Sequence, residues 1–280
     1  MAKRINTVAA ASRAAILLCA LLVSSSLSAL HLEGEIVQGG IVFGQVEPGS
    51  EVSLDGRNVM VSDNGNFVIG FGRDETGTRK LVVSEPSGAS TSKDLPIVKR
   101  EYRIERVDGL PPKTVTPDPE SLERIRNDAR MVGSARARRD ERTDYAEGFI
   151  WPAHGRISGV YGSQRVLNGE PRRPHFGLDI AAPTGEAVYA PAGGIITMAH
   201  PDLYYSGGTI VLDHGQGLSS SFLHLSKVTV KEGDIVKQGD KIGEIGATGR
   251  ATGPHLDWRM NWLNKRVDPQ VLVKGDPPAL

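Results

Sequence analysis

Short runs of apolar residues at alternate positions, separated by turn signals, occupy the chain from about Leu32 to Glu105. Apolar residues at every second position are typical of β-strands, because strand side chains alternate between two faces. Turn residues such as Pro48-Gly49-Ser50 and Asp63-Asn64-Gly65 divide these runs at hairpin spacing. The pattern predicts an immunoglobulin-like β-sandwich domain over residues 30–105, and it places no cluster of catalytic residue types there.

The pattern changes in residues 106–148, which open with several prolines. Apolar residues then recur at helical spacing among many charged ones, at Leu122, Ile125, Ala129 and Val132. Asp118 followed by Pro119 is typical of a helix start. The basic run 136–139 is followed at once by acidic residues. We therefore expect a Pro-rich and helical linker whose charges are solvated, rather than a binding surface.

From residue 149 to residue 280 the period returns to two, with glycine-rich turns between the apolar runs. Examples of these runs are Gly194–Met198, Gly208–Asp213 and Lys241–Ile245. Few segments have helical periodicity, so we expect a C-terminal antiparallel β domain. The predicted class is therefore mainly β: an N-terminal β-sandwich-like domain, a helical connector and a C-terminal β domain.

Residues 1–29 have the order of a secretory signal peptide, with basic residues first, an apolar run from Ala14 to Val23, and small residues after it. The alternative is an uncleaved membrane anchor, but the apolar run is shorter than the ~20 residues that a membrane span needs. The only cysteine, Cys19, lies inside this run after Leu18, an unfavourable context for lipidation. We therefore expect export to the periplasm or cell surface, with no stable membrane span after cleavage.

The net charge and the cysteine content limit the binding partners and the compartments that we expect. The 280 residues contain 33 basic and 33 acidic residues, a formal net charge of zero. Removal of residues 1–29 would take away Lys3, Arg4 and Arg13 and leave a charge of about −3. A chain without excess positive charge has no electrostatic footprint for nucleic acid. A mature chain without cysteine also tolerates an oxidising compartment.

Histidines and aspartates gather in short motifs of the last third: His175-x-x-x-Asp179, Phe222-Leu-His224-Leu-Ser and Gly253-Pro-His255-Leu-Asp257. On extended strands, residues two or four apart project from one face. Alternation also predicts one shared face for Ser220, Phe222, His224 and Ser226. Imidazoles and carboxylates on convergent faces are the ligands of a hydrolytic zinc ion, so the motifs predict a metal site.

Together, these and neighbouring motifs resemble the lysostaphin/LytM-type peptidoglycan metallopeptidase family. The resemblance covers roughly Trp151 to Val267. It rests on many motifs in the same order, namely Trp151-Pro, Gly155-Arg-Ile-Ser-Gly-Val-Tyr-Gly, His175-Phe-Gly-Leu-Asp179-Ile, Ala190-Pro-Ala-Gly-Gly, Asp213-His-Gly, His224-Leu-Ser and Gly246-Ala-Thr-Gly-Arg-Ala-Thr-Gly-Pro-His255.

The resemblance implies a zinc endopeptidase that cuts peptide cross-links of the bacterial cell wall and binds one zinc ion. It implies that His175 and Asp179 are zinc ligands, and that His224 and His255 are catalytic residues beside the reacting carbonyl. One of these two histidines would take or orient the proton of the attacking water, and the other would stabilise the developing oxyanion. The resemblance does not divide the two roles between them.

One position departs from the family pattern, because Asp257 stands where the family has the second histidine of a His-x-His motif. Asp is a good zinc ligand, with its oxygen ~2.0 to 2.2 Å from the metal. Its side chain is shorter than that of histidine, so direct ligation requires a shift of the strand or metal; otherwise a water would bridge. A second carboxylate would also make the metal less electrophilic.

Other residues have weaker functional assignments. The candidate substrate contacts are Tyr204, Tyr205 and the Arg172-Arg173 pair, of which we favour Arg173. The alternative is that these are simply exposed turn residues. We expect surface or turn positions for His31, His154 and His200. His214 is expected to be structural, since the resemblance places it outside the zinc shell.

Two other functions compete with the enzyme. Some domains of the resembled family have lost zinc ligands and activate other wall hydrolases, and Asp257 would fit such an adaptor. A biotinyl- or lipoyl-type carrier would suit the hairpin sequence Lys231–Gly246, but no lysine stands at an exposed tip for cofactor attachment. The expected partners are peptidoglycan peptides and, for an adaptor, other envelope or division proteins. The N-terminal domain could target the enzyme or cover its cleft.

Overall fold

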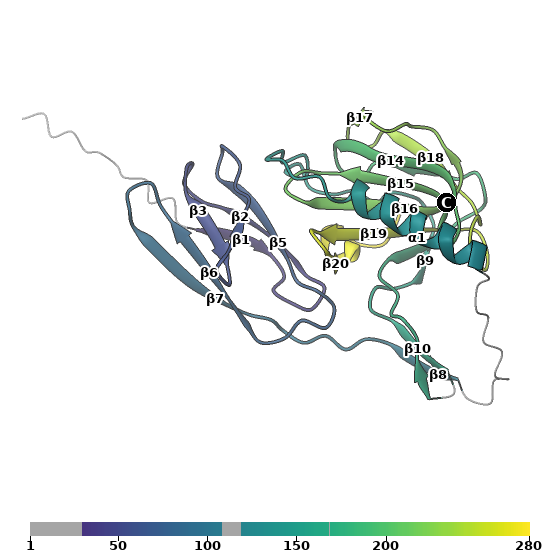
Figure 1. Ribbon diagram of the computed structural model, residues 1–280, viewed down its shortest axis with the longest axis horizontal. Helices are drawn as coiled ribbons and strands as arrows, with labels where there is room; N and C mark the ends of the chain where they lie inside the picture. Colours follow the sequence, from purple (N-terminus) through teal and green to yellow (C-terminus); the bar gives the residue numbers. More distant parts are fainter. Residues whose placement is uncertain (1–29, 108–118, 168) are drawn as a thin grey trace, which may run out of the picture.

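The computed structural model describes residues 30–107, 119–167 and 169–280, and these residues are mostly β-strand with one α-helix (Figure 1). Nearly all strand pairs are antiparallel. This confirms the predicted mainly β class. The predicted signal segment 1–29 and the predicted helix cap Asp118 lie outside the described residues. Among the residues described, no helix combines the length and the apolar character needed to span a membrane.

The N-terminal region consists of two antiparallel sheets. One sheet contains β1 (His31–Gly34), β2 (Ile41–Gln45) and β5 (Asn66–Gly70), and the other contains β3 (Glu51–Leu54), β4 (Arg57–Val59), β6 (Thr78–Ser84) and β7 (Ser90–Pro96). Apolar residues on alternate positions of both sheets are fully buried in a common core, among them Phe67, Ile69, Leu81 and Leu95. The arrangement is sandwich-like; the immunoglobulin-like assignment and the domain boundaries stay predictions.

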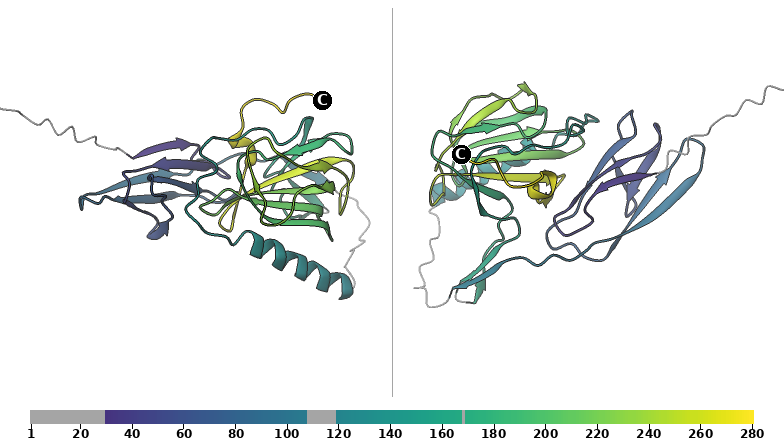
Figure 2. Two further views of the ribbon diagram at one scale, coloured as in Figure 1. Left: turned by 90° about the horizontal axis from the view of Figure 1, so that it is seen from above. Right: turned by 180° about the vertical axis from the view of Figure 1, so that it is seen from behind.

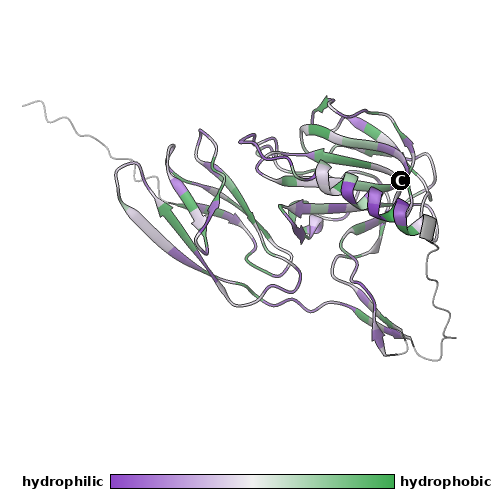
Figure 3. Ribbon diagram, viewed as in Figure 1, coloured by the Kyte–Doolittle hydropathy of each residue, from purple (hydrophilic) through white to green (hydrophobic). Residues whose placement is uncertain are grey.

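The C-terminal region is built on one large sheet, in which β17, β14, β15, β16, β19, β12 and β9 follow one another in space. Its strands are β9 (Arg156–Gly159), β12 (Leu178–Ala181), β13 (Ala187–Tyr189), β14 (Gly194–Leu203), β15 (Gly207–Asp213), β16 (Leu218–Val228), β17 (Ile235–Val236), β18 (Lys241–Ile245), β19 (His255–Trp262) and β20 (Lys265–Val267), and a 3-10 helix (Pro269–Leu272) follows. Hydrophobic residues occur among polar ones along these strands (Figure 3), and most of the buried hydrophobic residues belong to one core cluster. The sheet is therefore the main apolar core of the C-terminal region.

Strand β19 separates that core from a polar face. Its even-numbered residues Leu256, Trp258, Met260 and Trp262 are buried in the hydrophobic core. The odd-numbered residues His255, Asp257, Arg259 and Asn261 lie on the opposite face, which we call the cleft face. Residues directly opposite on neighbouring strands share a face, so Asp179 of β12, Ser219 and Ser221 of β16 and Arg266 of β20 also belong to the cleft face.

Helix α1 (Pro119–Ala135) packs on the same cleft face of the sheet and begins at the predicted proline. Val132 and Ala135 contact a small apolar cluster that includes Met198 and Val211. Figure 2 shows α1 lying along one side of the sheet. Of the apolar residues at helical spacing, Ala129 is exposed.

The neighbouring Asp128 faces the sheet and accepts a hydrogen bond from the Tyr204 backbone at 2.7 Å. Arg136, which follows α1, corrects a second expectation. Its guanidinium is not solvated but donates to Oδ1 of Asn261 at 3.1 Å.

The N-terminal sheets contact the C-terminal sheet on the side away from the cleft face. Gly70 of β5 packs against Trp262 and Val267, and Lys265 donates a hydrogen bond to its carbonyl at 3.2 Å. In Figure 1, β20 lies on the side of the C-terminal sheet that is nearest to β5.

The segment that leaves the N-terminal sheets forms β8 (Ile104–Val107). It pairs in parallel with β10 (Gln164–Leu167), which also pairs with β11 (Glu170–Pro171). The predicted linker thus begins as a strand of a small C-terminal sheet.

Candidate metal centre

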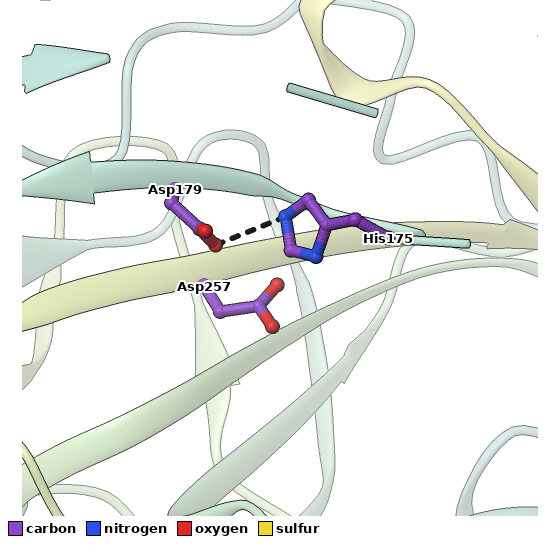
Figure 4. A group of neighbouring side chains, drawn as sticks. All are labelled: His175, Asp179 and Asp257. Atoms are coloured by element: carbon purple, nitrogen blue, oxygen red, sulfur yellow. Dashed lines mark ion pairs between the residues drawn. The ribbon is translucent and has the colours of Figure 1, made fainter. Parts of the chain in front are cut away.

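The three predicted ligands meet on the cleft face. His175, Asp179 and Asp257 each offer a ligand atom, and these atoms lie within 4.8 Å of one another. His175 Nε2 is 3.1 Å from Asp179 Oδ1. Figure 4 shows the imidazole and the two carboxylates directed toward a common point from β12, β19 and the segment before β12.

Backbone pairing brings these side chains together. Asp179 lies directly opposite Asp257 in the β12–β19 ladder, so the two carboxylates share a face. The backbone of His175 is held by two hydrogen bonds, from its N–H to the Ser163 carbonyl and from the Gly162 N–H to its own carbonyl, each at 2.8 Å. The imidazole therefore projects from an anchored extended segment rather than from β12 itself.

Two glycines leave room for the carboxylates. A Cβ atom at Gly159 would collide with Oδ2 of Asp179, and one at Gly177 would collide with Oδ1 of Asp257. Any other residue at either position would fill the space that a carboxylate occupies. The two glycines thus form a cradle for the pair of aspartates.

The donor set fits a zinc ion. His175 Nε2 and Asp179 Oδ1 are buried, and neither makes a hydrogen bond of good geometry with another described residue. Burial would lower the pKa of His175, but Asp179 and Asp257 raise it overall, so the two carboxylates favour a positive charge at this point. Imidazole nitrogen and carboxylate oxygen are ordinary zinc ligands, and an ion among them would satisfy both buried atoms.

Arg259 holds the carboxylate of Asp257, the residue that stands where the resembled family has a histidine. Its Nε lies 3.0 Å from both carboxylate oxygens of Asp257, and its Nη2 lies 2.5 Å from Oδ2. Burial of Asp257, which is 2% exposed, would raise its pKa, but Arg259 lowers it below the usual value. Asp257 is therefore ionised, and the contacts fix its orientation.

His224 and His255 lie beside the three ligand candidates, with ring centroids 4.8 Å apart. His224 Nδ1 bonds the Thr248 carbonyl and His255 Nδ1 bonds the Gly253 carbonyl, each at 2.8 Å. A carbonyl oxygen only accepts, so Nδ1 carries the hydrogen in both rings and Nε2 keeps a lone pair. Burial lowers the pKa of His224, which favours this neutral form.

The predicted alternation around His224 was wrong. Phe222 faces the core opposite Trp258, and Ser220 bonds the buried His214, whereas His224 lies beside His255 on the cleft face. The reason is local: His224 has φ +66°, in the left-handed region, and the register of β15 with β16 shifts nearby. Such a conformation is uncommon for a residue with a side chain. It turns His224 onto the cleft face despite its position in the strand.

The predicted substrate-contact residues, Tyr204, Tyr205 and Arg173, are not part of the group formed by His175, Asp179 and Asp257. Tyr205 is 37% exposed, and its ring lies 4.9 Å from that of Tyr204 and 4.4 Å from the guanidinium of Arg250. Its loop is close to the metal centre, because the adjacent Ser206 carbonyl accepts the His224 N–H at 2.8 Å. Arg173 is exposed and lies over the ring of Phe176 at 5.6 Å.

His214 is a buried structural residue, as its surroundings show. Its Nδ1 bonds the Gly193 carbonyl at 2.7 Å and its Nε2 bonds Ser220 Oγ at 2.8 Å. Burial lowers its pKa to about 4. His31 and His154 are exposed and His200 is partly exposed, and none of the three joins the cluster.

The sequence motifs did not identify Arg136, Arg259 and Arg266 around the site. Arg259 and Asn261 follow Asp257 at intervals of two, so the alternation of β19 could have identified them. Arg266 could not be found in this way, since its position depends on the pairing of β20 with β19. Arg136 was assigned to the linker because its neighbours in sequence are charged.

A large cavity lies elsewhere. It has a volume of ≈ 990 Å³ and is lined by residues of β1, β2 and the segment 145–151. Phe43, Trp151 and Val273 are among its lining residues. None of the clustered histidines or aspartates borders it. We place the chemistry at the group of His175, Asp179 and Asp257, because no such group of metal ligands occurs among the described residues that line the cavity.

An antiparallel sheet that presents one imidazole and two carboxylates to a common point, with two further imidazoles beside them, defines a metallohydrolase type of centre. Residues 173–269 match the model of Peptidase family M23. Residues 173–269 thus form a Peptidase M23 domain of the LytM type, as the resemblance of the motifs predicted.

Several proteins are similar to this chain. Peptidoglycan DD-endopeptidase ShyB of Vibrio cholerae is 42% identical over 107 residues, which are 38% of this chain and 24% of that protein. Cell division protein DipM of Caulobacter vibrioides is 35% identical over 134 residues, 47% of this chain and 20% of that protein. This chain therefore spans about a quarter or less of the length of these relatives.

One solved structure extends the similarity beyond the metal centre. A Pseudomonas aeruginosa protein assigned to peptidase M23 has a TM-score of 0.66 and 29% identity, over 85% of this chain and 95% of that chain. The matched length exceeds the C-terminal region, so the similarity includes N-terminal strands as well.

Proposed function

We propose that this protein is an exported, zinc-dependent endopeptidase that hydrolyses peptide cross-links of bacterial peptidoglycan. One observation carries the proposal: the ligand atoms of His175, Asp179 and Asp257 lie within 4.8 Å, beside two imidazoles. Membership of Peptidase family M23 and the similarity to a peptidoglycan DD-endopeptidase support the reaction and the substrate.

The chain's own residues supply the parts of an amide hydrolysis. Nε2 of His175 and a carboxylate oxygen of Asp179 and of Asp257 would hold one zinc ion. When bound, zinc supplies Lewis-acid polarisation of the scissile carbonyl and increases the acidity of water. Gly159 and Gly177 keep the space for the two carboxylates, and Arg259 keeps Asp257 ionised and oriented.

His224 and His255 would move the protons. Because Nδ1 of each ring donates to a backbone carbonyl, Nε2 of each ring is available to accept a proton from the attacking water. Once protonated, the same nitrogen can donate to the oxyanion or to the leaving amine. His255 Nε2 lies 4.0 Å from Asp179 Oδ1, so it is next to the metal ligands. Tyr204, Tyr205 and Arg173 remain our candidates for contacts with substrate.

Replacement of His224 tests this mechanism. We expect His224→Ala to abolish release of fragments from purified peptidoglycan while the full chain still binds one equivalent of zinc. His154→Ala is the control, since His154 is exposed and outside the cluster. If His224→Ala loses zinc together with activity, His224 is a ligand and the assignment is wrong. If it keeps full activity, His224 is not catalytic.

A second candidate function is an adaptor that activates other wall hydrolases. The contacts between Arg259 and Asp257 favour it, because a guanidinium already neutralises the carboxylate that would bind zinc. Zinc analysis and a peptidoglycan digest of the full chain separate the two functions. A chain that binds no zinc and cuts no peptidoglycan with any divalent metal, but stimulates a wall hydrolase, would be an adaptor.

The proposed location follows from the substrate. Peptidoglycan lies outside the cytoplasmic membrane, and residues 1–29 have the order of a signal peptide. We place the protein in the periplasm or at the cell surface, with envelope or division proteins as candidate partners, as the name of the relative DipM suggests. Fractionation of cells that express the chain with its native N-terminus tests the location.

A further inference from the structure

Three arginine side chains gather next to the metal centre on the cleft face. Arg136 follows α1, Arg259 lies in β19 and Arg266 lies in β20. Arg136 Nη1 and Arg266 Nη1 both donate to Oδ1 of Asn261, at 3.1 Å and 2.7 Å. Arg259 lies between Asn261 and Asp257 along the same face of β19. Three guanidinium groups from separate elements therefore converge on one small area, which we call the arginine cluster.

The arginine cluster has more positive than negative charge. Asp257 pairs with Arg259, whereas Arg136 and Arg266 have only the neutral Asn261 as a side-chain partner among the described residues. Burial, reinforced by the neighbouring guanidinium groups, lowers the pKa of Arg266 to about 9 and that of Arg136 to about 10. Both groups stay protonated at neutral pH. Two partly buried, desolvated cations that pair with no carboxylate among the described residues are unfavourable, and an anion would relieve them.

Two serines add unpaired hydroxyl groups to the same area. Ser219 lies opposite Asn261 and Ser221 lies opposite Arg259 in the β16–β19 ladder. The residues are 2% and 3% exposed, and neither hydroxyl has a hydrogen-bond partner in the part of the chain that the structure describes. Buried hydroxyl groups are normally paired. These two can donate to an acceptor placed among the three guanidinium groups.

We propose that the arginine cluster, with Ser219 and Ser221, binds a free carboxylate of the peptide substrate while the scissile bond lies at the metal centre. The proposal rests on the function proposed above and names the class of peptide that the site selects. Guanidinium groups match a planar carboxylate, since each can donate two parallel hydrogen bonds.

The position of the cluster limits where that carboxylate can be. Along β19, two residues span about 6.7 Å, so the backbone of Asn261, whose side chain accepts from Arg136 and Arg266, lies about 13 Å from that of Asp257. The guanidinium of Arg259 instead reaches back to the Asp257 carboxylate. An extended peptide advances about 3.3 Å per residue, so the carboxylate would belong to a residue about four positions from the scissile bond. A charge at that distance contributes to binding and orientation rather than to the chemical step.

Chemical masking of carboxylates tests the proposal on the wild-type chain. Cross-linked peptide fragments from purified peptidoglycan are used either untreated or with their free carboxyl groups converted to carboxamides. We expect kcat/KM to be at least about tenfold lower for the amidated fragments, because each charge-assisted hydrogen bond is strong. Equal values of kcat/KM for the two substrates would overturn the proposal.

Two variants locate the effect. Arg266→Gln and Arg136→Gln should each reduce the preference for free carboxylates to within about threefold, by raising KM for untreated fragments with little change for amidated ones. The two residues lie on different elements, so the second variant remains informative if the first does not fold. Arg126→Gln is the matched control, because Arg126 is exposed on α1 outside the cluster. An equal loss of preference in Arg126→Gln would contradict the assignment.

Binding to metal-free protein separates this proposal from the proposed function. The chelator-treated full chain is titrated calorimetrically with both kinds of fragment. The wild type should bind untreated fragments at least about tenfold more tightly than amidated ones, and Arg266→Gln should not discriminate. If the zinc-loaded chain cuts neither fragment but this difference persists, the endopeptidase fails and the carboxylate site stands. If the chain cuts both fragments equally well and binds them equally, only the carboxylate site fails.

Discussion

The two faces of β19 use the same strand for opposite purposes. One face contributes Leu256, Trp258, Met260 and Trp262 to the hydrophobic core. The other carries His255, Asp257, Arg259 and Asn261, and two of these polar residues are as deeply buried as the core: Asp257 and Asn261 are each 2% exposed. Burial alone therefore does not separate the structural face from the functional one.

The faces differ in whether their contacts are complete. Apolar side chains on the core face need only close packing, which the sheet and the N-terminal strands provide. Polar side chains on the cleft face need specific partners, and His175 Nε2, Ser219 Oγ and Ser221 Oγ have none of good geometry in the described chain. The unmet contacts mark where a metal ion and a substrate belong.

The core face should tolerate truncation least. Trp258 is fully buried, so Trp258→Ala should lower the free energy of unfolding by about 3–5 kcal/mol through lost packing and a cavity. Zinc affinity should change little at temperatures at which the variant is folded. Urea titration, followed by zinc titration of the folded variant, checks both. A stability loss below about 1 kcal/mol would contradict the assignment of Trp258 to the core.

Acid should destabilise the core face through His214. Its pKa is about 4 in the folded protein and about 6.5 when unfolded, so the unfolded chain binds the proton more readily. The stabilisation is complete above pH 6.5 and is lost as the pH falls toward 4, by roughly 2–3 kcal/mol. Unfolding free energies of wild type and His214→Gln, measured between pH 7 and pH 4, should show a shallower slope for the variant. Parallel slopes would exclude His214 as the cause.

Neutralising one carboxylate of the cleft face should have a smaller effect on stability. Asp257→Asn leaves Arg259 without its charged partner and should lower the free energy of unfolding by about 2 kcal/mol, since the 28% exposed Arg259 side chain retains some hydration. Adding Arg259→Met should recover most of this loss but not the affinity for zinc. If the double variant regains zinc affinity as well, Asp257 is not a ligand.

The glycine cradle should affect the metal centre more than the fold. Gly177→Ala places a Cβ against Asp257, so zinc affinity should fall by about tenfold, and the free energy of unfolding should fall by about 1–2 kcal/mol because the added methyl displaces a carboxylate that Arg259 holds. Gly133→Ala is the control, because an added Cβ there meets no atom within 4 Å. Competition with a chelating dye measures the affinities. Equal affinities for the two variants would remove Gly177 from the site.

Alternation and motif spacing were enough to predict the mainly β class and the residues that meet in the cluster. They failed where a single backbone conformation reverses the pattern, as at His224, whose positive φ cannot be inferred from the period of its strand. They also failed for Arg136, which is near Asn261 in space but 125 residues away in sequence. Long-range pairing decides such contacts, and a local pattern carries no information about it.

The pairing of β8 with β10 links the two halves of the molecule energetically. Gln164 donates its N–H to the Arg103 carbonyl at 3.0 Å, and the preceding residues Gly162 and Ser163 hold the backbone of His175. A ligand of the metal is thus two hydrogen-bonded steps from the segment that leaves the N-terminal sheets. By reciprocity, any force or partner that pulls this segment away should weaken metal binding, and bound metal should resist the displacement equally.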